Sequence, residues 1–225
     1  FSMRVPRPVM RMLARGKPFV PDALWPMLNT VASSMGSGPL VGTPPLRRVL
    51  ALCAHPDDEA IGCAGTLALL AASGAEIAVV YATRGDATRG SALPADEIGR
   101  RREAEARKAC EILGLPAPRF LSFNDGTLDG QVDGLAEAIA PVISEFKPDA
   151  IFVPWFLDGH SDHRAMSLAL AKLDPLPGVE VWAFEWWSAL PPNRIVDVSA
   201  VYQKKASAVT AHKTAHLAFA VRAAL

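Results

Sequence analysis

The chain has 225 residues, half of them hydrophobic, and its 23 Lys and Arg residues balance 23 Asp and Glu residues. This composition supports a folded core in one large domain, or in one domain with an extension, and argues against disorder. A formal net charge of zero also argues against a nucleic-acid partner. Three cysteines without C-x-x-C spacing, Cys53, Cys63 and Cys110, favour buried, reduced thiols and therefore a cytoplasmic location.

Residues 1–45 are expected to form an N-terminal extension, because they are rich in Pro, Gly and Ser and show no strong period. Phe1-Ser2 has the character of a cloning remnant and is left out of the predicted fold. One or two short helices are expected around residues 21–35. Basic residues among apolar ones between Arg4 and Lys17 would allow a weak contact with a membrane surface, although a solvated arm is the favoured alternative. No apolar run approaches the roughly 20 residues of a transmembrane helix.

From residue 46 onwards, strand patterns alternate with helix patterns. Strands are expected at 48–54, 76–82, 118–123, 149–154 and 180–186. Helices are expected at 60–73, 95–113, 131–146, 164–173 and 201–224. This alternation predicts an α/β domain, with a mostly parallel sheet that has helices on both faces.

A cluster of ionisable residues, His55-Pro56-Asp57-Asp58-Glu59, directly follows the first predicted strand of this domain. Open α/β sheets bind their ligands at the carboxyl ends of strands. Burying an imidazole and three carboxylates beside a hydrophobic strand is costly unless a cation or a substrate compensates them. The cluster therefore predicts a metal site.

A second polar cluster, Asp158-Gly159-His160-Ser161-Asp162-His163, follows the predicted strand 149–154 and begins a helix. His160 and His163 are three residues apart, so both can project from one face of that helix. Two clusters at strand ends of one parallel sheet converge over the same edge. Two histidines, one carboxylate and a water make an open catalytic zinc site.

With these two clusters in this order, the chain resembles the LmbE/PIG-L family of metal-dependent deacetylases, which act on N-acetylglucosaminyl compounds. The resemblance extends over about residues 48–213 and includes Thr83-Arg84-Gly85-Asp86 and the late helix from Lys205 to His212. It implies a Rossmann-like α/β fold, with the deacetylase domain spanning residues 46–225. The chain departs from the family pattern after His212, where Lys213-Thr214-Ala215 replaces the usual x-Ser-Gln.

The resemblance also implies roles for the residues of both clusters. Asp57 would act as the general base while a zinc-bound water attacks the amide carbonyl. A protonated His160 would stabilise the oxyanion, and Asp162 would orient a neighbouring imidazole. Three residues would bind zinc, or iron(II) in its place: His55, Asp58 and His163.

Weaker matches suggest four substrate-binding residues: Arg102, Asp125, Asp86 and His212. Each has a structural alternative: Asp57 could only cap the following helix, Arg102 could be solvated, and Asp86 could simply close a turn. His212 and His216 also stand four residues apart, which suits a metal, although a structural role is favoured.

The implied reaction is hydrolysis of an N-acetyl group on a small-molecule substrate, an N-acetylglucosamine-type amino sugar or its conjugate. One alternative is a metal-dependent amidase for a non-sugar or thiol-conjugate amide. Another is a non-catalytic nucleotide- or metal-binding module, against which stands the absence of G-x-G-x-x-G after the first strand. Two tryptophans, Trp155 and Trp187, are candidates for a platform that binds a sugar or an aglycone.

Overall fold

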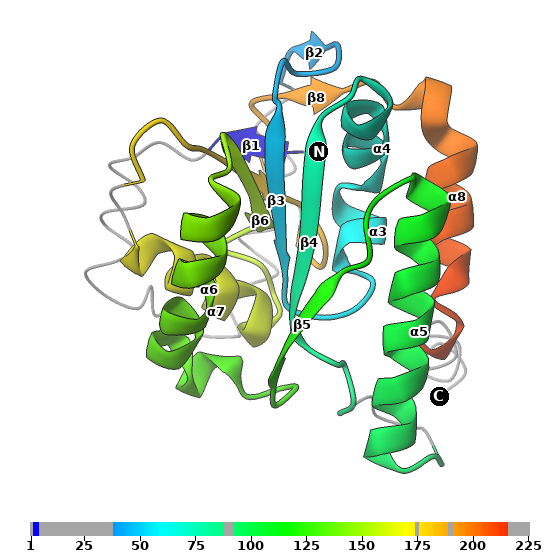
Figure 1. Cartoon of the computed structure of the whole chain (residues 1–225), viewed down its shortest axis with the longest axis vertical. Helices are drawn as coiled ribbons and strands as arrows, with labels where there is room; N and C mark the ends of the chain where they lie inside the picture. The colour runs from blue at the N-terminus through cyan, green and yellow to red at the C-terminus, as the bar shows by residue number, and fades with distance from the viewer. Residues whose placement is uncertain (1, 5–37, 88–91, 174–175, 189–190, 216–225) are drawn as a thin grey trace.

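The fold is taken from a computed structural model that describes residues 2–4, 38–87, 92–173, 176–188 and 191–215 (Figure 1). The short helices expected around 21–35 and the suggested membrane contact between Arg4 and Lys17 fall almost entirely outside these residues. Among the described helices, none combines the length and the hydropathy that crossing a membrane requires.

A six-stranded sheet forms the centre of the domain. Each strand is parallel to its neighbours, except that β1 is antiparallel to β7. From one edge to the other, the strands are β1 (Ser2–Arg4), β7 (Glu180–Phe184), β6 (Ala150–Pro154), β3 (Arg48–Cys53), β4 (Glu76–Thr83) and β5 (Arg119–Phe123). A second, two-stranded parallel sheet pairs β2 (Leu40–Val41) with β8 (Ile195–Val196).

Helices cover both faces of the large sheet, as the sequence predicts (Figure 1). One face is covered by α6 (Val132–Phe146) and α7 (Ser161–Lys172). The other is covered by α3 (Asp58–Gly62), α4 (Ala64–Ala72), α5 (Ala95–Leu113) and α8 (Tyr202–Ala211). Two short 3₁₀ helices, η2 (Leu128–Gly130) and η3 (Ser199–Val201), complete the described elements.

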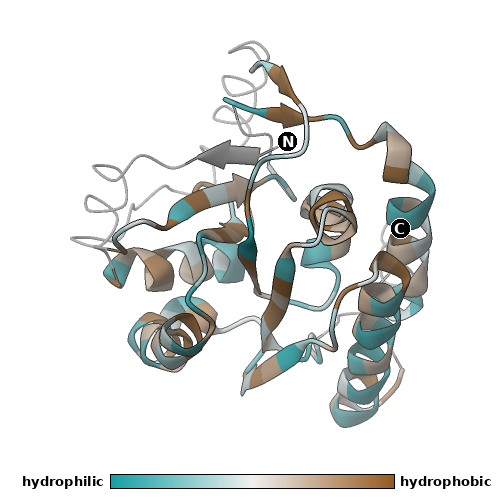
Figure 2. Ribbon diagram, turned by 45° about the horizontal axis from the view of Figure 1, so that its top comes forward, coloured by the Kyte–Doolittle hydropathy of each residue, from teal (hydrophilic) through white to brown (hydrophobic). Residues whose placement is uncertain are grey.

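Strand β3 separates two hydrophobic cores because its side chains alternate between the two faces of the sheet. Leu50 and Leu52 belong to the core under α6 and α7, whereas Val49, Ala51 and Cys53 belong to the core under α4, α5 and α8. Hydrophobic residues accordingly concentrate along the strands and the inner sides of the helices (Figure 2). The cluster His55–Glu59 therefore follows a strand that is buried on both faces.

The strands and helices predicted for the domain are confirmed within the described residues, with differences at their ends. The helix expected at 201–224 corresponds to α8, which ends at Ala211, and residues 216–224 of that expectation lie outside the described residues. The helix expected at 60–73 is two helices, α3 and α4, separated at Cys63. Helix α7 begins earlier than expected, at Ser161. Helix α5 ends at Leu113, as predicted, and the next residue, Gly114, has a φ of 78°, the left-handed conformation typical of helix ends. Cys53, Cys63 and Cys110 are free and buried, as expected.

Two short segments before residue 46 take part in these sheets, which the sequence did not predict. Ser2 pairs with Phe184, so it belongs to the large sheet, contrary to its expected exclusion from the fold. Leu40 and Val41 pair with Ile195 and Val196. Strands of two or three residues carry too little period to be recognised in a sequence.

Candidate active site

The two predicted clusters meet at the carboxyl edge of the parallel sheet. The ring of His55, which follows β3, lies 4.7 Å from the ring of His160 and 5.3 Å from that of His163, measured between centroids. The rings of His160 and His163 are 4.9 Å apart. Because β3 and β6 are adjacent and parallel, their carboxyl ends bring together residues that are more than 100 positions apart.

Asp58 presents one free carboxylate oxygen to two of these imidazoles. Its Oδ2 accepts hydrogen bonds from the backbone N–H groups of Ala54 (2.7 Å) and His55 (2.9 Å). Its Oδ1 is buried and has no hydrogen bond within the described residues. This oxygen lies 3.1 Å from Nε2 of His163 and 3.9 Å from Nδ1 of His55. Burial alone would raise the pKa of Asp58, but His163 and His55 outweigh burial and hold the pKa well below its usual range.

Carboxylates bind the opposite nitrogens of the same two imidazoles. Nε2 of His55 lies 3.1 Å from Oδ2 of Asp162 and 3.1 Å from Oδ1 of Asp125. Nδ1 of His163 lies 3.1 Å from Oδ1 of Asp158. A ring N–H that donates to a carboxylate leaves the other ring nitrogen able to bind a metal. The nitrogens left over are Nδ1 of His55 and Nε2 of His163, the two that face Oδ1 of Asp58.

More than one group of side chains in this cluster has metal-ligand spacing. Ligand atoms within 4.8 Å of one another occur in two sets, His55 with His160 and His163, and His55 with Asp125 and Asp162. The set expected from the family resemblance shares His55 and His163 with the first of these. It takes Asp58 in place of His160, and the unpaired Oδ1 of Asp58 fits that choice.

Asp57 adopts an unusual backbone conformation beside this cluster. Its φ of 124° and ψ of −19° lie outside the regions that L-residues favour, which costs about 1–3 kcal/mol. Its side chain makes no capping hydrogen bond to α3, so the capping alternative is wrong. Its Oδ2 lies 3.3 Å from Nη2 of Arg102. Burial raises the pKa of Asp57 to about 6, against the opposing effect of Arg102, and this value suits a general base.

Arg102 is buried beneath Asp57 and is not solvated. Its guanidinium donates to the backbone carbonyl oxygens of Gly85 (2.9 Å) and Pro56 (2.5 Å). Gly85 has a φ of +67°, and a Cβ atom there would lie 2.4 Å from Nη1 of Arg102. The loop after β4 therefore needs glycine at this position both for its conformation and for the close approach of Arg102.

His160 caps helix α7 through its side chain. Its Nδ1 accepts a hydrogen bond from the backbone N–H of Asp162 (3.2 Å), so the proton of the neutral ring lies on Nε2. Burial, together with the charges of His55 and His163, lowers the pKa of His160 to about 4. The neutral ring has an N–H on Nε2 to donate, and protonation of His160 during the reaction stays a prediction of the family resemblance.

Asp162 and Asp125 tie His55 to the loop after β5. Besides His55, Asp162 accepts hydrogen bonds from the backbone N–H groups of Gly126 (2.7 Å) and Leu128 (3.1 Å). Oδ2 of Asp125 accepts one from the backbone N–H of Ala87 (2.9 Å). Asp162 therefore orients an imidazole, as expected. Asp125 is bound to protein groups through both of its oxygens.

The remaining two candidate substrate residues lie at different depths. Asp86 is partly exposed in the loop after β4. His212 is buried at the end of α8, with its Nε2 3.4 Å from Oε1 of Glu59. Its suggested partner in a metal site, His216, lies outside the described residues.

Asp158 was not among the candidate site residues, although it is fully buried in the cluster. Its Oδ1 binds His163 and accepts the backbone N–H of His160 (2.9 Å). Its Oδ2 accepts the backbone N–H groups of Trp187 (3.0 Å) and Ser188 (3.3 Å). Its position in the polar cluster shortly after β6, which ends at Pro154, and five residues before His163 was the available signal.

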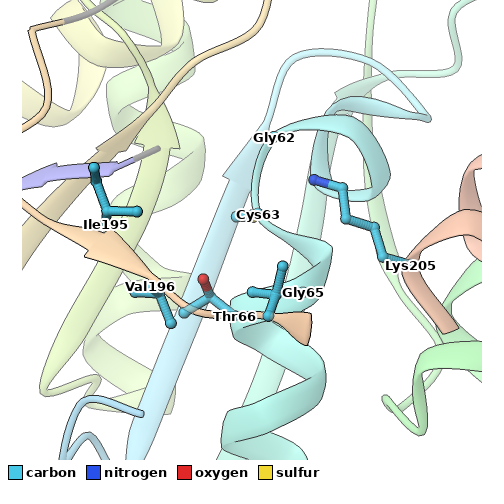
Figure 3. Close-up of a pocket in the computed structure, with 8 residues that line it drawn as sticks. Gly62, Cys63, Gly65, Thr66, Ile195, Val196 and Lys205 are labelled. Carbon is cyan, nitrogen blue, oxygen red and sulfur yellow. The ribbon is translucent and has the colours of Figure 1, made fainter. Parts of the chain in front are cut away.

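A separate cavity of about 140 Å³ lies between α4, β8 and α8 (Figure 3). Lys205 extends along it and donates from Nζ to the carbonyl oxygen of Ile61 (2.8 Å). None of the candidate catalytic or metal-binding residues lines this cavity, so it is distinct from the cluster. Its walls are formed by Gly62, Cys63, Gly65, Thr66, Ile195, Val196, Val198 and Lys205.

Comparison with known proteins places the chain in one family. The model of the PIG-L family, described as GlcNAc-PI de-N-acetylase, matches residues 50–173. Diacetylchitobiose deacetylase of Thermococcus kodakarensis is 30% identical, over 75% of this chain and 70% of that protein. Probable N-acetyl-alpha-D-glucosaminyl L-malate deacetylase 2 of Bacillus cereus is also 30% identical, over 75% of this chain and 83% of that protein.

Solved structures show the same fold. N,N'-diacetylchitobiose deacetylase from Pyrococcus horikoshii aligns with a TM-score of 0.66 and 24% identity, over 76% of this chain and 71% of that one. The conserved protein TT1542 from Thermus thermophilus aligns with a TM-score of 0.53 and 28% identity, over 75% and 79% of the two chains. The sequence matches confirm the resemblance read from the two clusters, and the chain belongs to the PIG-L family of de-N-acetylases.

Proposed function

We propose that this chain is a zinc-dependent hydrolase that removes the N-acetyl group from an N-acetylglucosamine-type sugar or from a conjugate of that sugar. The family and the named activities of its relatives support this reaction class. The observation that carries the proposal is the pairing of a zinc donor set with a buried carboxylate, Asp57, whose pKa of about 6 suits proton transfer near neutral pH.

The proposed zinc ligands are Nδ1 of His55, Oδ1 of Asp58 and Nε2 of His163. Their other polar atoms are bound to protein groups, which orients these three atoms towards a common partner. Iron(II) suits the same donors. A zinc ion there would act as a Lewis acid, which makes a water more acidic and polarises the amide carbonyl.

Asp57 is the proposed general base. Arg102 holds Oδ2 of Asp57 at 3.3 Å, which leaves Oδ1 to accept a proton from the attacking water and to pass it to the departing amine. The buried Arg102 also keeps the pKa of Asp57 from rising further. We therefore assign Arg102 to the positioning of Asp57 rather than to contact with sugar hydroxyls.

His160 is the proposed hydrogen-bond donor to the oxyanion. Because its Nδ1 is occupied by the backbone N–H of Asp162, its Nε2–H is the group available to the developing negative charge. Asp162 and Asp158 act through the imidazoles of His55 and His163, whose orientation they fix.

The identity of the substrate contacts, the domain limits and the cellular location are also proposals. Asp86 is the proposed contact for sugar hydroxyls, because it is partly exposed in the loop after β4, to which Asp125 binds through the backbone N–H of Ala87. Asp125 and His212 are proposed to line the sugar-binding site without being its main hydrogen-bonding contacts. The deacetylase domain is proposed to begin near residue 46, and the free, buried cysteines support a cytoplasmic location.

The test is acetate release from N-acetylglucosamine, N,N'-diacetylchitobiose and simple acetamides by the zinc-loaded protein. We expect the sugars to be preferred. Asp57→Asn should lower kcat by about 10²- to 10⁴-fold while zinc still binds. Asp96→Asn, which changes an exposed carboxylate paired with Arg84 and Arg100, is the matched control and should keep its activity. If simple acetamides are hydrolysed as fast as the sugars, the general amidase is favoured. If the zinc-bound protein releases no acetate from any of these compounds, the proposal is contradicted.

A further inference from the structure

The cavity between α4, β8 and α8 combines a lysine ammonium with an apolar wall (Figure 3). Its volume of about 140 Å³ is far above the roughly 10–15 Å³ that a single water molecule needs. Ile195, Val196 and Val198 form the apolar side, and each of them is half-buried, so this wall can be reached from solvent. The cavity is therefore large enough for a small organic solute.

Lys205 brings a positive charge into this cavity. Its Nζ donates to the carbonyl oxygen of Ile61, and no carboxylate among the described residues pairs with it. Burial lowers the pKa of Lys205, and the Cys63 thiol is the group that opposes this shift. Burial also raises the pKa of Cys63, so its thiol is neutral near pH 7 and does not offset the charge of the ammonium. An ammonium has three N–H donors, and two of those of Lys205 remain for a ligand.

Thr66 adds an unpaired hydroxyl to the wall of the cavity. This residue is only 7% exposed, and its hydroxyl makes no hydrogen bond to another described residue. A threonine inside a helix commonly bonds to the carbonyl oxygen one turn earlier, which here would be that of Gly62. The side chain of Thr66 lies between α4 and β8 (Figure 3). Its hydroxyl can therefore donate to a ligand in the cavity.

The first turn of α4 lines the same cavity. This helix has nine residues, and its N-cap, Cys63, makes no side-chain hydrogen bond to it. The first backbone N–H groups of a helix have no partner within the helix, and this end carries a partial positive charge. A Cβ atom at Gly65 would lie 2.6 Å from Cγ1 of Val198, so glycine allows β8 and its following residues to approach the backbone of this turn. The helix end and Lys205 together favour an anion.

We propose that this cavity is a second ligand site, which binds a short-chain carboxylate. The carboxylate would contact Lys205 and Thr66, and the alkyl part would contact Ile195, Val196 and Val198. A single ammonium suits a monoanion. The apolar side favours an alkyl group over phosphate, because oxygens of phosphate that face it would lose hydration without gaining a hydrogen bond. This site is separate from the candidate active site and does not depend on the proposed reaction.

The test is a titration of the zinc-loaded protein with butyrate, followed by the methyl NMR signals of Ile195 and Val198. We expect both signals to shift and to saturate. Lys205→Met keeps most of the length of the side chain but removes the charge, and it should raise the Kd for butyrate about tenfold. Lys204→Met removes the charge of the exposed neighbouring lysine on α8, and this matched control should keep the wild-type Kd.

Thr66→Val gives a second test that leaves the bond between Lys205 and Ile61 in place. Valine has nearly the same shape but no hydroxyl, so the Kd for butyrate should rise about threefold. If the Kd values of Thr66→Val and Lys205→Met both equal that of Lys204→Met, butyrate binds elsewhere and the site is overturned. Methyl signals that do not shift would also overturn it.

A parallel titration with phosphate checks the class of ligand. Weaker binding of phosphate than of butyrate supports the carboxylate site, whereas tighter binding of phosphate overturns it. Acetate release from sugars is measured separately, so failure of this second site would leave the proposed function untouched.

Discussion

Oδ1 of Asp158 lies 3.1 Å from Nδ1 of His163, and both side chains are buried. Burial lowers the pKa of His163, but Asp58 and Asp158 outweigh burial and raise it to about 9. In the metal-free protein, this imidazole is therefore a cation between two carboxylates. A zinc ion would take the place of the proton that His163 holds on the side of Asp58.

Replacement of Asp158 should weaken zinc binding. Asp158→Asn can no longer accept four hydrogen bonds or offset the charge on His163, so we expect zinc affinity to fall about 10- to 100-fold. Competition with a chelator of known affinity measures this. Asp149→Asn is the matched control, because Asp149 also accepts two backbone N–H groups, those of Arg47 and Arg48, at the amino end of β3. An equal loss of affinity in both variants would contradict the assigned role.

The ionisation of Asp57 should make the metal-free protein less stable as the pH rises. Burial raises the pKa of Asp57 to about 6, from an ordinary value of 3.8, so the folded state retains this proton to a higher pH than the unfolded state does. The contribution of Asp57 to the free energy of unfolding is therefore present below pH 4 and is lost as the pH rises through 6.

Asp57→Asn removes this titration. Relative to the wild type, we expect this variant to gain stability between pH 4 and pH 7, on the order of 2 kcal/mol. Urea unfolding at several pH values, with zinc removed, measures the difference. A difference that does not change with pH would show that Asp57 ionises normally.

Gly85→Ala should impair catalysis through Arg102. The added Cβ would overlap the guanidinium, which must then move away from Asp57 and Pro56, and kcat should fall about 10- to 100-fold. Gly74→Ala is the matched control, because Gly74 has a φ of +87° but a Cβ there would meet nothing within 4 Å. Both variants should lose about 1 kcal/mol of stability from the left-handed backbone, and only Gly85→Ala should lose activity. If Gly85→Ala and Gly74→Ala have equal activity, the effect of Gly85 on catalysis through Arg102 is refuted.

Removal of zinc should lower the resistance of the protein to unfolding. Zinc at 1,000 times its dissociation constant would add about 4 kcal/mol to the free energy of unfolding. Urea titrations with and without a chelator measure this difference. Asp58→Asn preserves an acceptor for the Ala54 and His55 amides but removes the ligand charge, so its midpoint should respond little to the chelator. A wild-type midpoint that the chelator leaves unchanged would argue against a bound metal.

Local sequence patterns were sufficient to predict the α/β fold and the position of the site. A strand buried on both faces, such as Arg48–Cys53, leaves an unbroken apolar run, and the ionisable residues that follow such a run mark the carboxyl edge of the sheet. His55, Asp57 and Asp58 in one cluster, with His160 and His163 in the other, could therefore be named before the structure.

Only the tertiary structure decided how these residues are connected. Contacts within the site join residues that are 29 to 107 positions apart in the sequence. These contacts are Asp158 with Trp187, Arg102 with Asp57, and Asp162 with His55. Their meeting depends on the strand order, with β6 on one side of β3 and β4 on the other. The same holds for Trp155 and Trp187, which look alike in the sequence but lie in the core and at the surface. Hydrophobic periodicity is a local property that determines which segments form strands and helices, whereas side-chain contacts depend on strand order, register and rotamers, which long-range packing selects.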